Sequence, residues 1–155
     1  MSAKNYQGEN LASGYALTKK LWEFIYPDDH FDETTELKDI YEADRLQDKV
    51  TLERILKEDF TVNFSLCPEW YDQFLSMPWF RIYTLNIDDL VENILDNGTS
   101  SRKFKSVSAS SSSFNIGDNI LEIIHLNGKL DDLPDDVVFS RTCLLYTSPS
   151  PRDRG

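Results

Sequence analysis

Apolar side chains recur at helical spacing through the first half of the chain. In residues 16–26, Leu17, Leu21 and Ile25 share one face, which is the pattern of an amphipathic helix packed on a core. Pro68 precedes a further apolar segment, and proline is favoured at the start of a helix. The spacing predicts four helices, at residues 16–26, 35–47, 50–59 and 69–77.

The pattern changes after Pro78. Residues 79–84 (WFRIYT) and 119–126 (NILEIIHL) are short, aromatic or β-branched runs, and such runs are typical of buried strands. Between them, residues 89–95 have helical spacing and end at Asn97-Gly98. Three further features are expected: a strand with a mobile loop, or a linker, in the serine-rich segment 99–113, a turn at Asn127-Gly128, and a short strand or loop edge at 137–139.

A strand, a helix and a strand in this order predict a parallel sheet with crossover helices. The fold class is therefore α/β, a parallel sheet with crossover helices preceded by a helical N-terminal half. In such sheets ligands bind beyond the carboxyl ends of the strands. Two polar clusters, Thr84–Asp88 and His125–Gly128, follow the two strands, so we expect a site where they meet.

Composition narrows the possible partners. The chain has 155 residues, 40% of them hydrophobic, and a formal charge of −11, so one folded domain is expected. An acidic surface repels phosphate backbones and anionic lipid, which disfavours direct nucleic-acid or membrane binding. The polar start lacks the apolar run of a signal peptide, and the expected compartment is the cytoplasm.

Metal and disulfide chemistry are also disfavoured. The chain has two cysteines, Cys67 and Cys143, too few for a disulfide framework or a four-cysteine zinc site. Asp131-Asp132 and Asp135-Asp136 are interpreted as a solvated acidic loop. No metal ligands are therefore predicted.

The segment Tyr83–Leu90 (YTLNIDDL) has two readings. Asn or Asp between a strand and a helix commonly caps the helix by accepting from its free N–H groups. The same helix end also offers N–H groups to a ligand, so capping and binding are compatible.

YTLNIDDL resembles the T-x-N-I-D signature of the sirtuins and their bacterial sirtuin-like relatives. A second block, IIHLNGKLDDLPDDVVFS, resembles the later strand of that family, which ends in His-Gly. The resemblance is best over residues 50–140. It implies a Rossmann-like domain that holds NAD and cleaves the bond between nicotinamide and ribose.

The resemblance also implies roles for individual residues. Asn86 would hold the ribose or the attacking water, Asp88 would bind the nicotinamide carboxamide, and Thr84 would line the phosphate or ribose side. Gly128 would belong to the cofactor site. Ser13-Gly14-Tyr15 resembles the segment that follows the glycine-rich turn of bacterial relatives, which adds Ser13 and Gly14 to the cofactor-binding residues.

The chain departs from the family pattern at the residue that serves as the catalytic base. Asn127 occupies the place of the catalytic histidine next to Gly128, and His125 stands two residues earlier. Residues i and i+2 of a strand share a face, so His125 is expected to point the same way, either as a base or as a packed histidine with one hydrogen bond. Asn86, His125 and Asn127 are the candidate catalytic residues.

Both ends of the chain depart as well. No apolar strand or G-A-G turn precedes Ser13, and only Gly8 remains as a possible remnant of that turn, so the true N-terminus is expected to be missing. CLLYTSPSPRD, from Cys143, resembles a translated transposase adapter from sequencing libraries. The predicted division is a partial sirtuin-like domain at 1–142 and a non-native, disordered tail at 143–155.

Without zinc-binding cysteine pairs, the resemblance points to the bacterial group, whose domains commonly hydrolyse NAD in antiviral defence with a sensor domain or partner. The leading hypothesis is an NAD hydrolase that releases nicotinamide and ADP-ribose. The alternatives are an NAD-dependent protein deacylase, a non-catalytic module that senses NAD or ADP-ribose, and a fragment that folds poorly alone.

Overall fold

The structure is a computed structural model that describes residues 2–109, 120–133, 137 and 139, with only the backbone of Leu46. Its described part contains helices and a small sheet. The α-helices are α1 (Gly14–Ile25), α2 (Leu37–Gln47), α3 (Lys49–Phe60), α4 (Trp70–Leu75) and α5 (Leu90–Asn97). The strands are β1 (Arg81–Thr84), β2 (Phe104–Ser108) and β3 (Leu121–His125), and two short 3-10 helices are η1 (Phe64–Leu66) and η2 (Leu130–Asp132).

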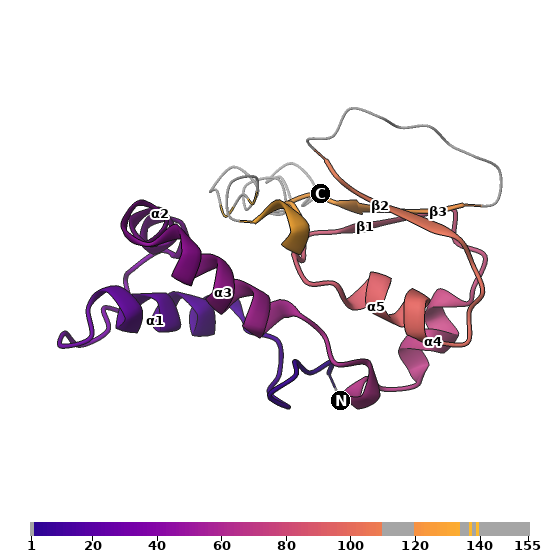
Figure 1. Ribbon diagram of the computed structural model, residues 1–155, viewed down its shortest axis with the longest axis horizontal. Helices are drawn as coiled ribbons and strands as arrows, with labels where there is room; N and C mark the ends of the chain where they lie inside the picture. Colours follow the sequence, from indigo (N-terminus) through magenta and orange to yellow (C-terminus); the bar gives the residue numbers. More distant parts are fainter. Residues whose placement is uncertain (1, 110–119, 134–136, 138, 140–155) are drawn as a thin grey trace, which may run out of the picture.

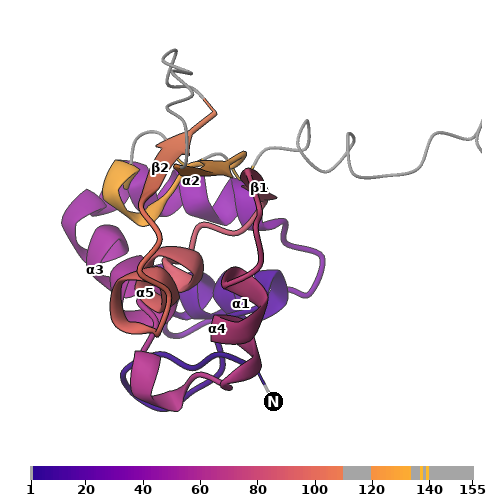
Figure 2. The same ribbon diagram turned by 90° about the vertical axis from the view of Figure 1, so that its right-hand side faces the viewer.

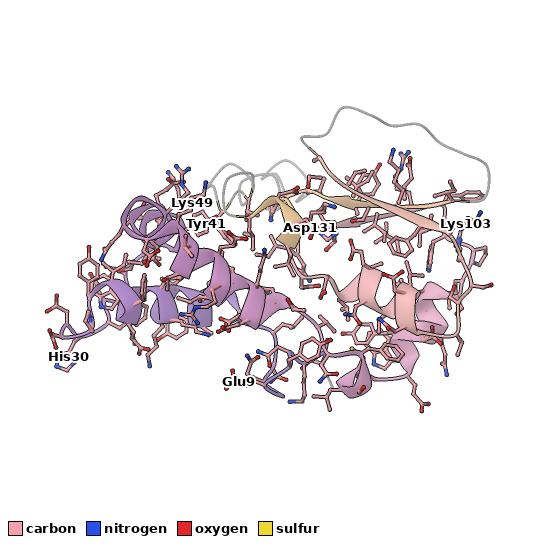
Figure 3. All side chains as sticks on the ribbon, in the orientation of Figure 1. Glu9, His30, Tyr41, Lys49, Lys103 and Asp131 are labelled. Carbon is pink, nitrogen blue, oxygen red and sulfur yellow. The ribbon has the colours of Figure 1, made fainter. Side chains whose placement is uncertain are left out.

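The elements form two groups, which lie side by side in Figure 1. Helices α1, α2 and α3 pack on one another at one end of the molecule, and the sheet lies at the other end. Helices α4 and α5 lie against one face of the sheet, as Figures 1 and 2 both show. The short helix η2, which carries Asp131, lies between the two groups and contacts α3 (Figure 3).

The three strands form a parallel sheet in the order β1-β3-β2. All five residues of the central strand β3 are buried, which confirms the expectation of a buried strand in this segment. Arg81 on β1 donates to Glu122 on β3 at 2.5 Å and 2.7 Å, so the ion pair joins the two strands. The mixed α/β class and the parallel pairing predicted from the sequence are thus confirmed.

The predicted N-terminal helices are also present. The Ser13 hydroxyl accepts from the Ala16 N–H and caps α1, because a helix leaves its first N–H groups without internal partners. The apolar faces of α1, α2 and α3 meet in one core around Leu17, Leu21 and Leu52. Val137 and Phe139 pack on this core and are assigned to no strand, whereas Val138, the middle residue of the segment predicted as a short strand or loop edge, lies outside the described residues.

A second core lies between the sheet and its two covering helices. Leu121 and Ile123 of β3 pack on Leu75, Ile94 and Leu95. These strand residues alternate with Glu122 and Ile124, as the period of a strand requires. The side chain of His125 continues the face that looks toward α5.

Gly98 ends α5 for a reason other than the one the sequence suggested. A glycine after a helix commonly adopts positive φ, but Gly98 has φ −80°. A Cβ atom at this position would lie 2.2 Å from Asp72 Oδ1 and 2.5 Å from the Ile94 carbonyl oxygen. The residue is glycine because α4 and α5 approach each other there.

Other expectations are met only in part. The serine-rich segment 99–113 does contain strand β2, whereas residues 110–113 lie outside the described residues, as do Asp135-Asp136 and the tail 143–155. The turn at Asn127-Gly128 is present, with Gly128 at φ +88°. In the described part of the chain, no helix has the length and apolar character needed to cross a membrane.

We expect Ile123→Ala to lower the free energy of unfolding by about 2–5 kcal/mol, because it opens a cavity beneath the central strand. Urea denaturation measures this change. Val50→Ala is the matched control, since Val50 is 77% exposed and its truncation is expected to change stability by less than about 0.5 kcal/mol. Equal effects of the two substitutions would contradict the described core.

One carboxyl group is buried in the helical group without a hydrogen-bond partner in the described structure. Asp44 on α2 is 0% exposed, and both of its carboxylate oxygens are unpaired. Burial raises the pKa of Asp44 to about 7, because a charged carboxylate is poorly solvated there. The folded state therefore binds a proton that the unfolded state releases near pH 4.

Stability should consequently fall as the pH rises from about 4 to about 7 and then level off. Asp44→Asn is expected to remove this fall and to raise the free energy of unfolding at pH 8 by on the order of 2–4 kcal/mol. Urea denaturation at pH 4 and pH 8 measures the difference. Asp39→Asn, an exposed carboxylate on the same helix, is the control and should leave the pH dependence unchanged.

Candidate functional site

The two polar clusters meet at the carboxyl edge of the sheet. Thr84 of β1 and Ser108 of β2 both pair in register with His125 of β3. Because the strands are parallel, the segments that leave β1 and β3 emerge side by side. The loop Leu85–Asp89, here called the motif loop, therefore lies next to His125–Gly128, as predicted.

The motif loop is fixed to both groups of elements. Ile87 is 4% exposed and lies in the core of α1, α2 and α3. Asp89 Oδ1 accepts from the Val62 N–H at 2.7 Å, and Asn93 Nδ2 donates to the Val62 carbonyl oxygen at 3.0 Å. The contact of Asp89 holds the loop to Val62, two residues after the end of α3, and the neighbouring contact of Asn93 holds α5 to the same residue.

Asn86 presents its side chain to solvent while its backbone is engaged. Its N–H donates to Thr84 Oγ1 at 3.0 Å, and its carbonyl oxygen accepts from His125 Nδ1 at 2.9 Å. No hydrogen bond involves the Asn86 side chain among the described residues. The carboxamide is thus available to a ligand on a backbone that is already held.

Asp88, two residues after Asn86, is buried. Asp88 is 7% exposed, and its Oδ1 accepts from the Leu90 N–H at 3.2 Å. Burial raises the pKa of Asp88, and the hydrogen bond from Leu90 opposes the rise only in part. The bond to Leu90 satisfies a donor of the first turn of α5, so capping and a ligand role remain compatible for Asp88.

His125 does not match the expectation of a histidine with one partner. Its ring is 1% exposed, with Nδ1 on the Asn86 carbonyl oxygen at 2.9 Å and Nε2 on Glu92 Oε1 at 2.7 Å. Ser106 donates its hydroxyl to the same Glu92 oxygen. Both ring nitrogens are therefore engaged beneath the motif loop.

Asn127 and Gly128 lie beside the motif loop. Asn127 Nδ2 donates to the Leu85 carbonyl oxygen at 2.8 Å, and its Oδ1 is buried without a partner in the described structure. Gly128 provides the positive φ of the turn. The predicted residues Thr84, Asn86, Asp88, His125, Asn127 and Gly128 are thus brought into one region.

In the part of the chain that the structure describes, two pockets flank the motif loop, and Asp88 lines both. The smaller pocket, of about 290 Å³, is bounded by Gly14, Leu85, Asn86, Ile87 and Asp88, with apolar side chains from α1, α2, α3 and Phe139. It brings Gly14 to Asn86, although 71 residues separate them in the chain. Of the two N-terminal residues predicted to bind the cofactor, Gly14 therefore lines the pocket, while the hydroxyl of Ser13 caps α1.

The larger pocket, of about 490 Å³, lies on the side of α5. Polar and charged side chains dominate its lining: Lys57, Thr61, Asp88, Asp89, Glu92, Asp96, Ser106, His125, Lys129 and Asp131.

The predicted solvated acidic loop is found only in part. Asp131 is exposed, as expected, but the carboxylate of Asp132 is engaged in hydrogen bonds. It accepts from the Ser108 hydroxyl and from the Lys129 N–H.

The sequence did not identify Glu92, Ser106 or Asp89 as members of the site. Glu92 lies on a helix whose other inward residues are apolar, and Ser106 lies in a serine-rich segment, so neither had a distinguishing pattern. Their roles depend on the packing of α5 against β2 and β3. Within the described ranges, no group of three potential metal-ligating side chains gathers in a metal-binding arrangement.

Comparison with known proteins adds no assignment. No protein-family model matches the chain, and a search of curated proteins finds no significant match.

We expect Asp89→Ala to lower the free energy of unfolding by about 1–3 kcal/mol, because the Val62 N–H loses its acceptor in a buried setting. Chemical denaturation measures the loss. Asp96→Ala removes an exposed carboxylate from α5, two turns further along, and should change stability by less than about 0.5 kcal/mol. If Asp89→Ala were equally mild, Asp89 would not anchor the motif loop.

Proposed function

We propose that the chain is part of a sirtuin-like, Rossmann-like domain that binds NAD and hydrolyses it to nicotinamide and ADP-ribose. The observation that carries the proposal is the smaller pocket. It combines Gly14, at the start of α1, with Asn86 and Asp88 of the motif loop. The resemblance to sirtuins assigns these separate segments to one cofactor, and the pocket is consistent with that assignment.

The first turn of α1 offers a place for the pyrophosphate. The N-terminus of a helix carries unpaired N–H groups and a partial positive charge, so it favours an anion. The residues described around the smaller pocket include no lysine or arginine. Backbone N–H groups would therefore hold the phosphates, in place of basic side chains.

The motif loop offers the groups for the nicotinamide end. The exposed carboxamide of Asn86 would hold the ribose or a water molecule, and the carboxylate of Asp88 would accept from the nicotinamide carboxamide. Cleavage of the glycosidic bond develops positive charge on the ribose. Preorganised polar groups that face this charge lower the barrier, and a fixed backbone at Asn86 meets that requirement.

A second function is favoured by the surroundings of His125. Both of its ring nitrogens are engaged, and the family's histidine position is occupied by Asn127. A general base must be within reach of the proton that it removes, and a ring held in this way is not free to act as one. The second candidate is therefore a module that binds NAD or ADP-ribose without cleaving it.

Asn86→Ala is expected to reduce nicotinamide release from NAD by about 100-fold or more, the usual effect of removing one preorganised polar group. Chromatographic measurement of nicotinamide tests this. The fold should persist, because the substitution leaves the backbone bonds to Thr84 and His125 in place. Asn97→Ala, at the end of α5 and outside both described pocket linings, is the control and should leave release unchanged.

Calorimetric titration with NAD separates the two candidates. Binding together with nicotinamide release supports the hydrolase, and binding without release supports the non-catalytic module. A folded protein that neither binds nor cleaves NAD would refute both.

A further inference from the structure

We propose that His125, as an imidazolium ring bonded on one side to Glu92 and on the other to the Asn86 carbonyl, is a positioning residue that holds Asn86 for the dinucleotide. This role rests on the proposed function. It differs from the catalytic role expected for His125 from the sequence, because the ring acts on the backbone of the motif loop and does not touch the reacting atoms.

The direction of the two hydrogen bonds identifies the form of the ring. A carbonyl oxygen only accepts, so the contact of 2.9 Å between Nδ1 and the Asn86 oxygen requires a hydrogen on Nδ1. An ionised carboxylate also only accepts, so the contact of 2.7 Å between Nε2 and Glu92 Oε1 requires a hydrogen on Nε2. With Glu92 ionised, both bonds exist together only when the ring is doubly protonated.

Glu92 is in turn held in place. The Ser106 hydroxyl donates to Oε1 from the neighbouring strand, and the Glu92 side chain is 18% exposed. A carboxylate so placed, with a cation at 2.7 Å, is stabilised in its charged form. The chain of hydrogen bonds therefore runs from Ser106 on β2 through Glu92 on α5 and His125 on β3 to the motif loop.

The ionisation tendencies of the two groups agree with this pairing. Burial lowers the pKa of His125, but the hydrogen bond and charge of Glu92 outweigh it, so the net pKa is raised. Burial raises the pKa of Glu92, but the hydrogen bonds from His125 and Ser106 outweigh it, so the net pKa is lowered. Each group thus favours the charged form of the other.

Other charged groups face the same region. Asp88 contributes to the raised pKa of His125 from the motif loop. The remaining charged side chains around the larger pocket are Lys57 on α3, Asp89 in the motif loop, Asp96 on α5, and Lys129 and Asp131 at η2. None of these makes a described hydrogen bond to the ring, so Glu92 is its specific partner.

When the ring loses one proton, ionised Glu92 retains the hydrogen on Nε2, so the hydrogen on Nδ1 is lost together with the bond to the Asn86 oxygen. A ring protonated only at Nε2 directs a lone pair of Nδ1 at the Asn86 oxygen. Affinity for NAD should therefore fall as the pH rises through the raised pKa of His125, since the stabilising contribution is present only below it.

Two substitutions separate the two bonds. In His125→Asn, the side-chain amide stands near the former Nδ1 and retains a donor for the Asn86 oxygen. In His125→Gln, it reaches toward the former Nε2 and retains a donor for Glu92. We expect the Asn variant to keep NAD affinity within about threefold, with the pH dependence removed, and the Gln variant to lose about tenfold or more.

A merely structural role predicts the opposite order. Glutamine fills more of the ring volume and keeps the contact with Glu92, so it would be the milder substitution for a packed residue. Glu92→Gln is a further variant, and it should move the fall in NAD affinity to lower pH by lowering the pKa of His125. Asp96→Asn removes a charge from the same helix and pocket, and as the control it should leave that midpoint in place.

The protonation state is measured separately in the unaltered 155-residue chain with ¹⁵N-labelled histidine. The chain has two histidines, and the signals of His30, exposed at the tip of the helical group (Figure 3), are identified by their absence from a His30→Gln variant. Both ring nitrogens of His125 should show N–H shifts above the ordinary histidine pKa of about 6.5.

The outcomes distinguish this role from the proposed function. A neutral His125 ring below the ordinary histidine pKa of about 6.5, or the Gln variant binding NAD more tightly than the Asn variant, would overturn the positioning role while NAD binding stands. If the unaltered chain does not bind NAD although His125 is doubly protonated, the proposed function fails and this role fails with it.

Discussion

The arrangement of the candidate site depends on the burial of one side chain, Ile87. It lies in the core formed by α1, α2 and α3, although the chain on either side of it belongs to the sheet and to α5. Burying an aliphatic side chain of this size contributes about 1.5–3 kcal/mol. That contribution draws the motif loop against the helical group and places its polar neighbours, Asn86 and Asp88, at the boundary between two cores.

Hydrogen bonds then fix the conformation of the motif loop, which burial of Ile87 alone does not determine. Asp89 accepts a hydrogen bond from the Val62 N–H, and His125 donates one to the Asn86 carbonyl oxygen, so both contacts fix the motif loop. Hydrophobic contact is not directional, whereas these bonds are. The combination of apolar burial and directional hydrogen bonds explains the alternation along this short loop. The carboxamide of Asn86 is exposed, Ile87 is buried, and the carboxyl group of Asp88 lies in a polar pocket.

The sequence predicted the elements well because their signals are local. Helical spacing placed α1 through α5, and two apolar runs placed β1 and β3 as parallel neighbours with their polar ends together. Strand β2 was harder to define, since its serine-rich segment has no strong period.

The link between His125 and Glu92 could not be predicted, because it joins residues 33 positions apart through the packing of α5 beneath β3. The termination of α5 at Gly98 likewise depends on Asp72 of another helix, so the local rule for glycine gave the right boundary for the wrong reason.

The position of Asp88 between the two pockets has a thermodynamic consequence. A cationic or hydrogen-bond-donating molecule in one pocket changes the charge that a molecule in the other pocket experiences. Two such occupants would be energetically coupled, and the coupling is reciprocal: each alters the affinity of the other by the same factor. A single carboxylate is enough to make two separate cavities behave as linked sites.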